Sequence, residues 1–161
     1  MIIKINQSQL PECLNIMKEG FEAIALMFGM TEENSPYRGR TRLPIEELEK
    51  QFLSGYQMYG YFYDDKIVGF LSLFIEEEQI QIQDIVILPE YQNNGFGSTF
   101  MQFAKEKARE NKCEKIMLNT IIDNIQLKNW YERHGFKVIK LRNFDSVTYT
   151  VATMELNLTE E

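Results

Sequence analysis

The sequence is poor in the residues that build cross-links and metal centres. Its 161 residues contain two cysteines, Cys13 and Cys113, and one histidine, His134. The two cysteines form no CxxC pair, so their spacing indicates neither a metal site nor a disulfide framework. We expect both thiols to be small core or half-buried residues. A chain without disulfides fits a reducing, cytoplasmic location.

The sequence also lacks long apolar runs and an excess of positive charge. No run approaches the roughly 18 apolar residues of a membrane span, and the N-terminal MIIKINQSQL lacks the apolar segment of a signal peptide. With 17 basic and 24 acidic side chains, the formal net charge is −7. An acidic surface argues against duplex nucleic acid and anionic membranes as main partners, and mildly favours a cationic small molecule or peptide.

The remaining composition is that of an ordinary globular protein. Hydrophobic residues make up 44% of the chain and charged residues 25%, which is typical of a protein with a packed core. The length is sufficient to bury such a core without disulfides or metals. No repeat, low-complexity tract or linker divides the sequence, so we expect a single domain over residues 1–161.

The spacing of apolar residues in the first half predicts a short strand, two helices and three further strands. MIIKI predicts the first strand, a helix follows from about Gln9 to Phe28 with Ser8 as its cap, and IEELEKQFLSG predicts a second helix. The segment from Gln57 to Leu88 is rich in aromatic and β-branched residues and contains turn formers at 64–66 and 76–78. It predicts three antiparallel strands joined by hairpins.

The second half predicts two helices and three strands. A helix is expected from about Gly95 to Asn111, a strand in EKIMLNT, a helix that stops at Gly135, and two closing strands in FKVIKL and VTYTVATMEL. The order β-α-α-β-β-β-α-β-α-β-β predicts a mixed α/β or α+β fold around a central, largely antiparallel sheet.

A glycine-rich stretch, YQNNGFGSTF, lies between a predicted buried strand and a predicted helix. Gly95 and Gly97 let backbone N–H groups converge without a Cβ in the way. The helix N-terminus adds unpaired donors and a partial positive charge. Together these features predict an anion site, most naturally for a phosphate or diphosphate. A structural turn without a ligand is the alternative for this stretch by itself.

The glycine pattern excludes two common phosphate loops. It contains no GK[ST], so it is not a Walker A loop. Phe100 occupies the place of the third glycine of the dinucleotide fingerprint, and the preceding strand belongs to a hairpin meander rather than a βαβ unit.

Two motifs resemble those of the GNAT superfamily, the acetyl-CoA-dependent N-acetyltransferases. QNNGFG, residues 92–97, matches the family loop Q/R-x-x-G-x-G/A, and NIQLKNWYERHGFK resembles the later signature N-x-x-A-x-x-x-Y-E-x-x-G-F. The predicted element order is similar to the family fold from end to end. The resemblance implies a GNAT-like fold, acetyl-CoA as the acetyl donor, and a primary amine of a small molecule or peptide as the acceptor.

The resemblance implies that the main chain holds much of the cofactor. Backbone groups of three strand residues would pair with the pantetheine arm like an extra strand, and the side chain of Asn124 would meet the same region. The loop would hold the diphosphate through its backbone donors. The implied cofactor-binding residues are Ile85, Val86, Ile87, Gln92, Asn93, Asn94, Gly95, Phe96, Gly97, Ser98, Asn124 and Tyr131. We expect the side chains of the three strand residues to lie in the core.

Tyr131 is the candidate general acid. It shares one helix face with Asn124 and Leu127. Acetyl transfer needs a neutral amine, a polarised thioester carbonyl and a proton for the departing thiolate, and a phenol near the sulfur can donate that proton. A backbone N–H near Val86 would bind the oxyanion. The alternative for Tyr131 is a packed aromatic residue with a satisfied hydroxyl.

Asp84 is the candidate general base. In IQIQDIVIL it has the parity of the apolar residues at 80, 82, 86 and 88, which places it on the apolar side of the strand, where desolvation would raise its pKa. A β-bulge would reset this parity. A structural aspartate bonded to a neighbouring loop is the alternative.

The sequence departs from the family at the usual positions of the base. Some relatives carry a glutamate at the position of Gln83 and others at that of Asn119, and neither residue here can accept a proton. The remaining candidates for the general base are Asp84, Glu90 and a water chain. The alternative is an acceptor amine that arrives already neutral. This departure keeps open a second function, a non-catalytic CoA-binding sensor or interaction module.

The acceptor region is expected between residues 30 and 43, with the strand in GYQMYGYFY. Tyr37, Arg38, Arg40 and Arg42 would grip a carboxylate or phosphate of the substrate, contact the 3′-phosphate of the cofactor, or form a solvated charged run. His134 is expected to be a structural residue at a helix end. The aromatic strands and the segment VTYTVATMEL are candidate surfaces for a homodimer, although no residue in the sequence requires one.

Overall fold

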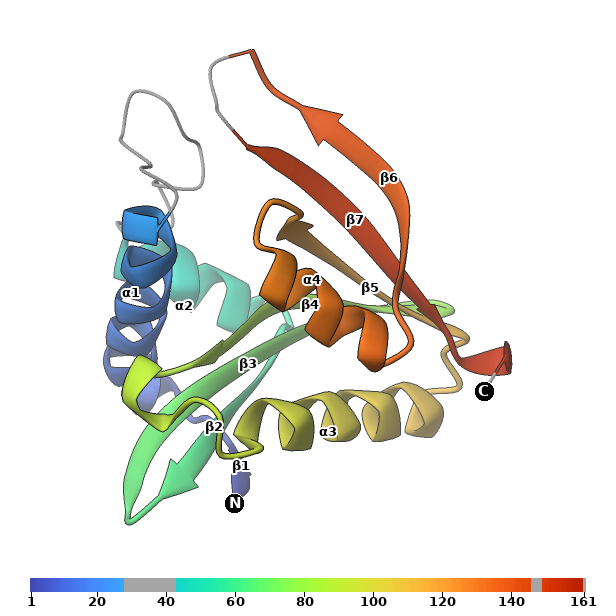
Figure 1. Cartoon of the computed structure of the whole chain (residues 1–161). Coiled ribbons are helices and arrows are strands. Elements are labelled where there is room, and N and C mark those ends of the chain that lie inside the picture. The colour runs from blue at the N-terminus through green and yellow to red at the C-terminus, as the bar shows by residue number, and fades with distance from the viewer. Residues whose placement is uncertain (28–42, 146–148, 161) are drawn as a thin grey trace.

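The structure, a computed structural model, describes residues 1–27, 43–145 and 149–160. One seven-stranded sheet has the order β1-β2-β3-β4-β5-β7-β6, with helices on both of its faces (Figure 1). The element order confirms the predicted mixed α/β fold. All strand pairs are antiparallel except β4 with β5. The prediction of a largely antiparallel sheet is therefore also confirmed.

The bounds of the elements agree closely with those predicted. The strands are β1 (Ile2–Lys4), β2 (Gln57–Tyr63), β3 (Lys66–Glu76), β4 (Gln79–Ile87), β5 (Lys115–Ile121), β6 (Lys137–Asn143) and β7 (Thr150–Asn157). The helices are α1 (Leu10–Met27), α2 (Ile45–Leu53), α3 (Phe96–Glu110) and α4 (Ile125–Arg133), with the 3₁₀ turns η1 (Gln7–Gln9), η3 (Pro89–Tyr91) and η4 (Leu158–Glu160). Among these described helices, none combines the length and apolarity needed to cross a bilayer.

The start of α1 differs from the prediction. Ser8 lies inside η1 rather than directly before the helix, and its hydroxyl donates to Oδ1 of Asn6. The N–H of Asn6 donates to Oε1 of Gln9 at 2.9 Å. Because the chain enters the helix through a 3₁₀ turn, the capping residue moves two positions upstream. The prediction of Ser8 as the cap is therefore wrong.

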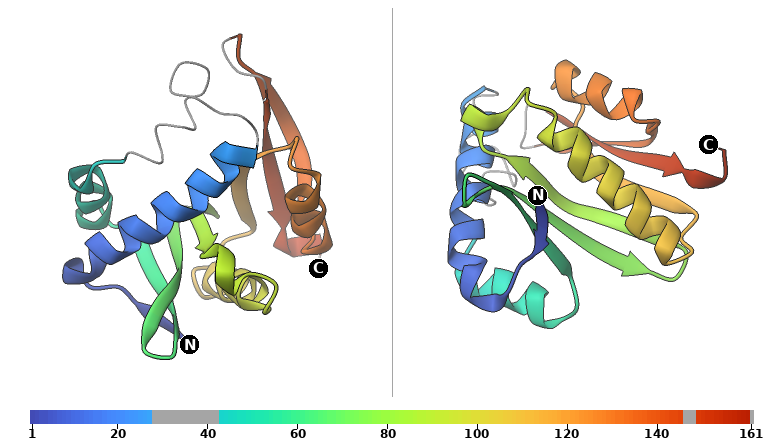
Figure 2. Two further views of the ribbon diagram at one scale, coloured as in Figure 1. Left: turned by 60° about the vertical axis from the view of Figure 1, so that its left-hand side comes forward. Right: turned by 90° about the horizontal axis from the view of Figure 1, so that it is seen from below.

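The sheet separates two apolar cores. Neighbouring residues of β3 point in opposite directions, as a pleated strand requires. Phe70 packs with α1 and α2, whereas Leu71 packs with α3 and with Tyr131 of α4. Figure 2 shows α1 and α3 on either side of the strands. We call these two sides the α1/α2 face and the α3/α4 face.

A β-bulge in β4 changes the face on which Asp84 lies. Ser72 pairs with Asp84, but the next residue, Leu73, pairs with Ile82, so Gln83 is the extra residue of the bulge. Ile82 packs on the α3/α4 face, whereas Val86 packs on the α1/α2 face. Asp84 and Ser72 therefore point toward α1. The parity prediction across the strand is wrong, although the side chain of Asp84 is buried as expected.

The sheet opens between β4 and β5. The two strands pair only from Gln79 with Lys115 to Gln81 with Met117. Beyond this point β4 continues along β3, and β5 continues along β7 (Figure 1). In the described chain, residues 82–87 thus have no strand partner on the side that faces β5. The carbonyl oxygen of Ile87 accepts from the side chain of Gln92. No strand covers the other main-chain groups on that side, so an extended ligand can pair with them.

Candidate functional site

The glycine-rich loop turns sharply between η3 and α3. Asn93 and Gly95 adopt left-handed conformations with φ of 65° and 80°, and Gly95 precedes the first residue of α3. The side-chain amide of Asn94 donates to the carbonyl oxygens of Tyr91 at 3.0 Å and Gln92 at 3.2 Å. The N–H of Thr99 makes the first α3 bond, to the carbonyl of Gly95 at 3.0 Å. The N–H groups before it have no partner within the helix, which is the geometry of an anion site.

Gln92 fixes the loop to the end of β4. Its amide Nε2 donates to the carbonyl oxygen of Ile87 at 3.1 Å. Since Ile87 is the last residue of β4, this bond ties the start of the loop to the free edge of the strand. The side chain of Gln92 thus positions the loop relative to β4.

The two glycines are needed for different reasons. A Cβ on Gly97 would lie 3.2 Å from the ring of Trp130 in α4, so this glycine permits the close approach of two helices. A Cβ on Gly95 would meet nothing within 4 Å. Its positive φ is the constraint there, because side chains disfavour that backbone conformation.

Helix α4 presents Asn124 and Tyr131 toward the same region. Asn124 caps the helix, and its Oδ1 accepts from the N–H of Leu127 at 3.2 Å. The amide nitrogen of Asn124 remains available as a donor. Tyr131 is 5% exposed and packs edge-on against Trp130 and Phe136, with ring centroids 5.2 and 5.9 Å apart. Trp130 and Phe136 pack in the core, as predicted.

The hydroxyl of Tyr131 is protonated and makes no hydrogen bond to the described residues. Burial raises the pKa of this phenol well above its usual value. A phenol in this state can donate a proton and cannot serve as a base.

A buried polar pair lies on the opposite face of the sheet. Ser72 is fully buried and Asp84 is 4% exposed, and the two residues are directly opposite each other in β3 and β4. The hydroxyl of Ser72 has no hydrogen-bond partner among the described residues. A Cβ on Gly20 of α1 would lie 2.4 Å from Cγ1 of Val86, so α1 packs directly onto this part of β4.

Ser72 was not predicted as a site residue. The sequence offers one signal, because Ser72 is the single polar residue in the run GFLSLF of a predicted buried strand. A buried hydroxyl without a partner is costly. Its position opposite Asp84 therefore marks the pair as a candidate polar site beside the opening of the sheet.

Glu90 and the two residues at the family's usual positions of the base lie in different surroundings. Oδ1 of Asn119 accepts from Nη2 of Arg142 at 2.9 Å and from Oγ1 of Thr153 at 2.7 Å, so this residue links strands of the sheet. Gln83 is the half-buried bulge residue. Glu90 is exposed in η3.

The cysteines lie in the core, as predicted. Both are buried. Burial raises the pKa of the Cys13 thiol to about 12 and also raises that of the Cys113 thiol. Both thiols are protonated at neutral pH, so neither is an activated nucleophile.

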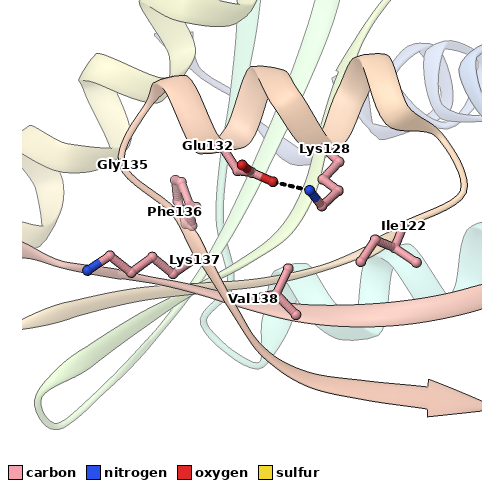
Figure 3. A pocket seen from close by; sticks show the side chains of 7 residues that line it. All are labelled: Ile122, Lys128, Glu132, Gly135, Phe136, Lys137 and Val138. Carbon is pink, nitrogen blue, oxygen red and sulfur yellow. Dashed lines mark ion pairs between the residues drawn. The ribbon is translucent and has the colours of Figure 1, made fainter.

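The predicted acceptor loop falls largely outside the described residues. This applies to Tyr37, Arg38, Arg40 and Arg42. A pocket of about 610 Å³ beside α4 and β6 contains none of the predicted site residues. Figure 3 shows the ion pair of Lys128 with Glu132 among its lining side chains. The lining residues are Ile122, Lys128, Glu132, Gly135, Phe136, Lys137 and Val138.

Known proteins resemble this chain in sequence and in fold. The model of the "Acetyltransferase (GNAT) family" matches residues 23–136. "Uncharacterized protein YxbD" of Bacillus subtilis is 32% identical over 89 residues, which are 55% of this chain and 54% of that protein. The chain thus spans about half the length of this relative.

Two solved structures share the fold over nearly the whole chain. The ribosomal-protein-S18-alanine N-acetyltransferase of Escherichia coli has a TM-score of 0.78 at 14% identity and covers 98% of this chain and 93% of its own. The PaiA N-acetyltransferase of Thermoplasma acidophilum, in complex with coenzyme A, has a TM-score of 0.76 at 19% identity and covers 98% of both chains.

Proposed function

Because the chain belongs to the GNAT family of acetyltransferases, we propose that it takes acetyl-CoA as its donor and transfers the acetyl group to a primary amine of a small molecule or peptide. The transfer is a direct attack on the thioester, and residues 1–161 act as one domain. The observation that carries this proposal is the opening between β4 and β5. It has the glycine loop and Tyr131 on the α3/α4 face and the pair Asp84–Ser72 on the α1/α2 face.

In this proposal acetyl-CoA binds along the α3/α4 face. The N–H groups of residues 93–98 hold the diphosphate at the N-terminus of α3. The free edge of β4 at residues 85–87 pairs with the amides of the pantetheine arm, as an added strand would. The side-chain amide of Asn124 donates to the same arm. The thioester then lies at the opening, where Tyr131 can approach its sulfur.

The proposed reaction divides proton transfer between the two faces. The amine nitrogen attacks the thioester carbonyl carbon, the C–S bond breaks, and the thiolate takes the proton of the Tyr131 hydroxyl. Burial raises the pKa of the Tyr131 phenol, and the same surroundings also raise the pKa of the departing thiol. Burial therefore does not prevent proton transfer from the phenol to the thiolate. Asp84 accepts the amine proton, directly or through a water. A backbone N–H near Val86 stabilises the oxyanion.

A second candidate function follows from Gln83 and Asn119. The resemblance to the family implies a catalytic glutamate at the first of these positions in some members and at the second in others. Asn119 is instead hydrogen-bonded to Arg142 and Thr153 within the sheet. This observation favours a CoA-binding sensor or interaction module without turnover. Binding and turnover must therefore be measured separately.

The first experiment is thermal unfolding with and without acetyl-CoA. ATP and NAD are the controls, because both carry phosphates and neither has a pantetheine arm. A ligand at a hundred times its Kd adds about 2.7 kcal/mol to the free energy of unfolding, which corresponds to several degrees in Tm. A shift with acetyl-CoA alone supports the proposed site. Equal shifts with all three ligands, or none at all, would contradict it.

The second experiment separates the two functions. Free thiol is measured during incubation with acetyl-CoA and a panel of polyamine, amino sugar, amino acid and peptide N-terminus. Thiol release that depends on one amine class supports the transferase and identifies its acceptor class. Tight binding without release for every class supports the non-catalytic module.

A further inference from the structure

The side chain of His134 reaches the glycine loop from the end of α4. His134 is the one histidine of the chain, and its Nε2 is 3.3 Å from the hydroxyl of Ser98 in the first turn of α3. Its ring packs edge-on against Trp130, with centroids 4.6 Å apart, and Trp130 in turn covers Gly97. His134 is thus both the predicted helix-end residue and a direct neighbour of the phosphate-binding turn.

The charges around His134 oppose its protonation in the free protein. Burial lowers the pKa of the imidazole, and so do the positive charges of Lys105 in α3 and Arg133 in α4. The ring is therefore neutral at pH 7, paired with the Ser98 hydroxyl. Ser98 itself is exposed, so a ligand at this turn can meet both side chains. An anion bound here would raise the pKa of His134, because its negative charge favours the imidazolium.

We propose that His134 and Ser98 form a side-chain contact for the diphosphate of acetyl-CoA, and that protonation of His134 tightens this contact. The inference rests on the proposed binding of the diphosphate at the N-terminus of α3. It adds a charged residue from α4 to a site otherwise made of main-chain groups. It also makes cofactor affinity depend on pH.

Thermodynamic linkage determines whether cofactor affinity rises or falls with pH. If the anion raises the pKa of His134, the protonated protein binds the cofactor more tightly by the same factor. Affinity is then highest below the pKa of the free protein. It falls as the pH rises through the higher pKa of the complex, and it is flat above that value. A rise of about 1 in the pKa corresponds to about tenfold in Kd.

The direct test is the NMR titration of the single histidine. We expect the His134 pKa to rise by about 1 when CoA binds. Dephospho-CoA should give the same rise, because it retains the diphosphate, and this excludes the titration of the 3′-phosphate as the cause. Pantetheine lacks the diphosphate and should leave the pKa unchanged. This measurement uses the wild-type protein and needs no acceptor.

A binding experiment provides the second readout. The Kd of dephospho-CoA is measured by calorimetry between pH 5 and 8 for the wild type, His134→Gln and Lys140→Gln. Lys140 is an exposed cation of the edge strand β6, so its replacement controls for net charge. His134→Gln should flatten the pH profile and bind about tenfold more weakly than the wild type near pH 5. Lys140→Gln should retain the wild-type profile.

Failure of this inference is distinct from failure of the proposed function. If CoA binds and the His134 resonances titrate identically in the free and bound protein, His134 only fastens α4 to α3, and the inference is overturned while the proposed function stands. If CoA does not bind at any pH, both are overturned.

Discussion

The two faces of the sheet build their candidate sites in different ways. On the α3/α4 face the site consists of consecutive residues, a loop and the first turn of a helix, with Tyr131 added from α4. On the α1/α2 face Ser72 and Asp84 come from two strands and meet only because of the bulge at Gln83. The proposed donor side is thus encoded locally, whereas the proposed acceptor side depends on strand register.

This difference has a consequence for specificity. A loop held by main-chain geometry suits a constant ligand such as acetyl-CoA, since many side chains are compatible with it. The α1/α2 face is defined by strand register, by the packing of α1 and by isolated polar residues. If the proposed reaction is correct, single substitutions on this face change which acceptor is used. The following four predictions test these proposed roles of the two faces, from the largest expected effect to the smallest.

Tyr131→Phe tests the contribution of the α3/α4 face to chemistry. The variant removes the hydroxyl and retains the ring packed against Trp130 and Phe136. We expect kcat to fall by about tenfold or more, while the Kd of acetyl-CoA changes little. Steady-state kinetics and calorimetry measure the two quantities. An unchanged kcat would remove Tyr131 from the mechanism.

Asp84→Asn tests the contribution of the α1/α2 face. Because the amide cannot accept a proton, we expect kcat/KM for the amine to fall by about tenfold or more near neutral pH. The loss should shrink as the pH approaches the pKa of the acceptor, since the amine then arrives neutral. A pH–rate profile of the variant measures this. A loss that is equal at every pH would assign Asp84 a structural role instead.

Gly95→Ala tests whether the loop conformation serves the ligand, and Gly55→Ala is its matched control. Both glycines have positive φ, 80° and 101°, and a Cβ would meet nothing within 4 Å at either. Each variant should lose about 1 kcal/mol of folding free energy. Only Gly95→Ala should weaken acetyl-CoA binding, because Gly55 follows α2, away from the loop.

Denaturant unfolding and calorimetry compare the two glycine variants. Equal affinity of both for acetyl-CoA would show that the loop geometry does not hold the diphosphate. Gly97→Val is a harsher variant of the same test, since its side chain would collide with Trp130. It should weaken binding further.

Ser72→Ala is expected to have the smallest effect of the four. The buried hydroxyl has no partner among the described residues, so its removal should leave the free energy of unfolding unchanged or raise it by about 1 kcal/mol. If the hydroxyl serves the acceptor side, kcat/KM for the amine falls severalfold, and Ser72→Thr restores it. A gain in stability with unchanged kinetics would make Ser72 a packing residue only.

The elements that the sequence predicted correctly depend on local patterns. Apolar spacing located the helices and hairpins, and Gly135 marked the end of α4, where its φ is 100°. The motif around Gly95 and Gly97 lies at the turn that the structure forms between β4 and α3. These features need no knowledge of distant residues.

The features that the sequence did not reveal depend on pairing between distant segments. Apolar and polar residues alternate from Ile80 to Gln83, but Asp84 follows directly and residues 85–88 are all apolar. Because a continuous apolar run fits either face of a strand, this pattern does not fix the register on the two sides of the bulge at Gln83. β4 and β5 pair over three residues only, although β5 pairs with β7 along its full length, and no local pattern in either strand marks this divergence. The contact of Ser98 with His134 likewise joins two helices.

The most direct test of the account is hydrogen exchange of the backbone amides with and without acetyl-CoA. Main-chain recognition predicts that the cofactor protects two separate segments, 85–87 on the free edge of β4 and 93–98 at the start of α3. Residues of β6, at the far edge of the sheet, should exchange at the same rate in both states. Saturating acetyl-CoA with no added protection in either segment would contradict the proposed site.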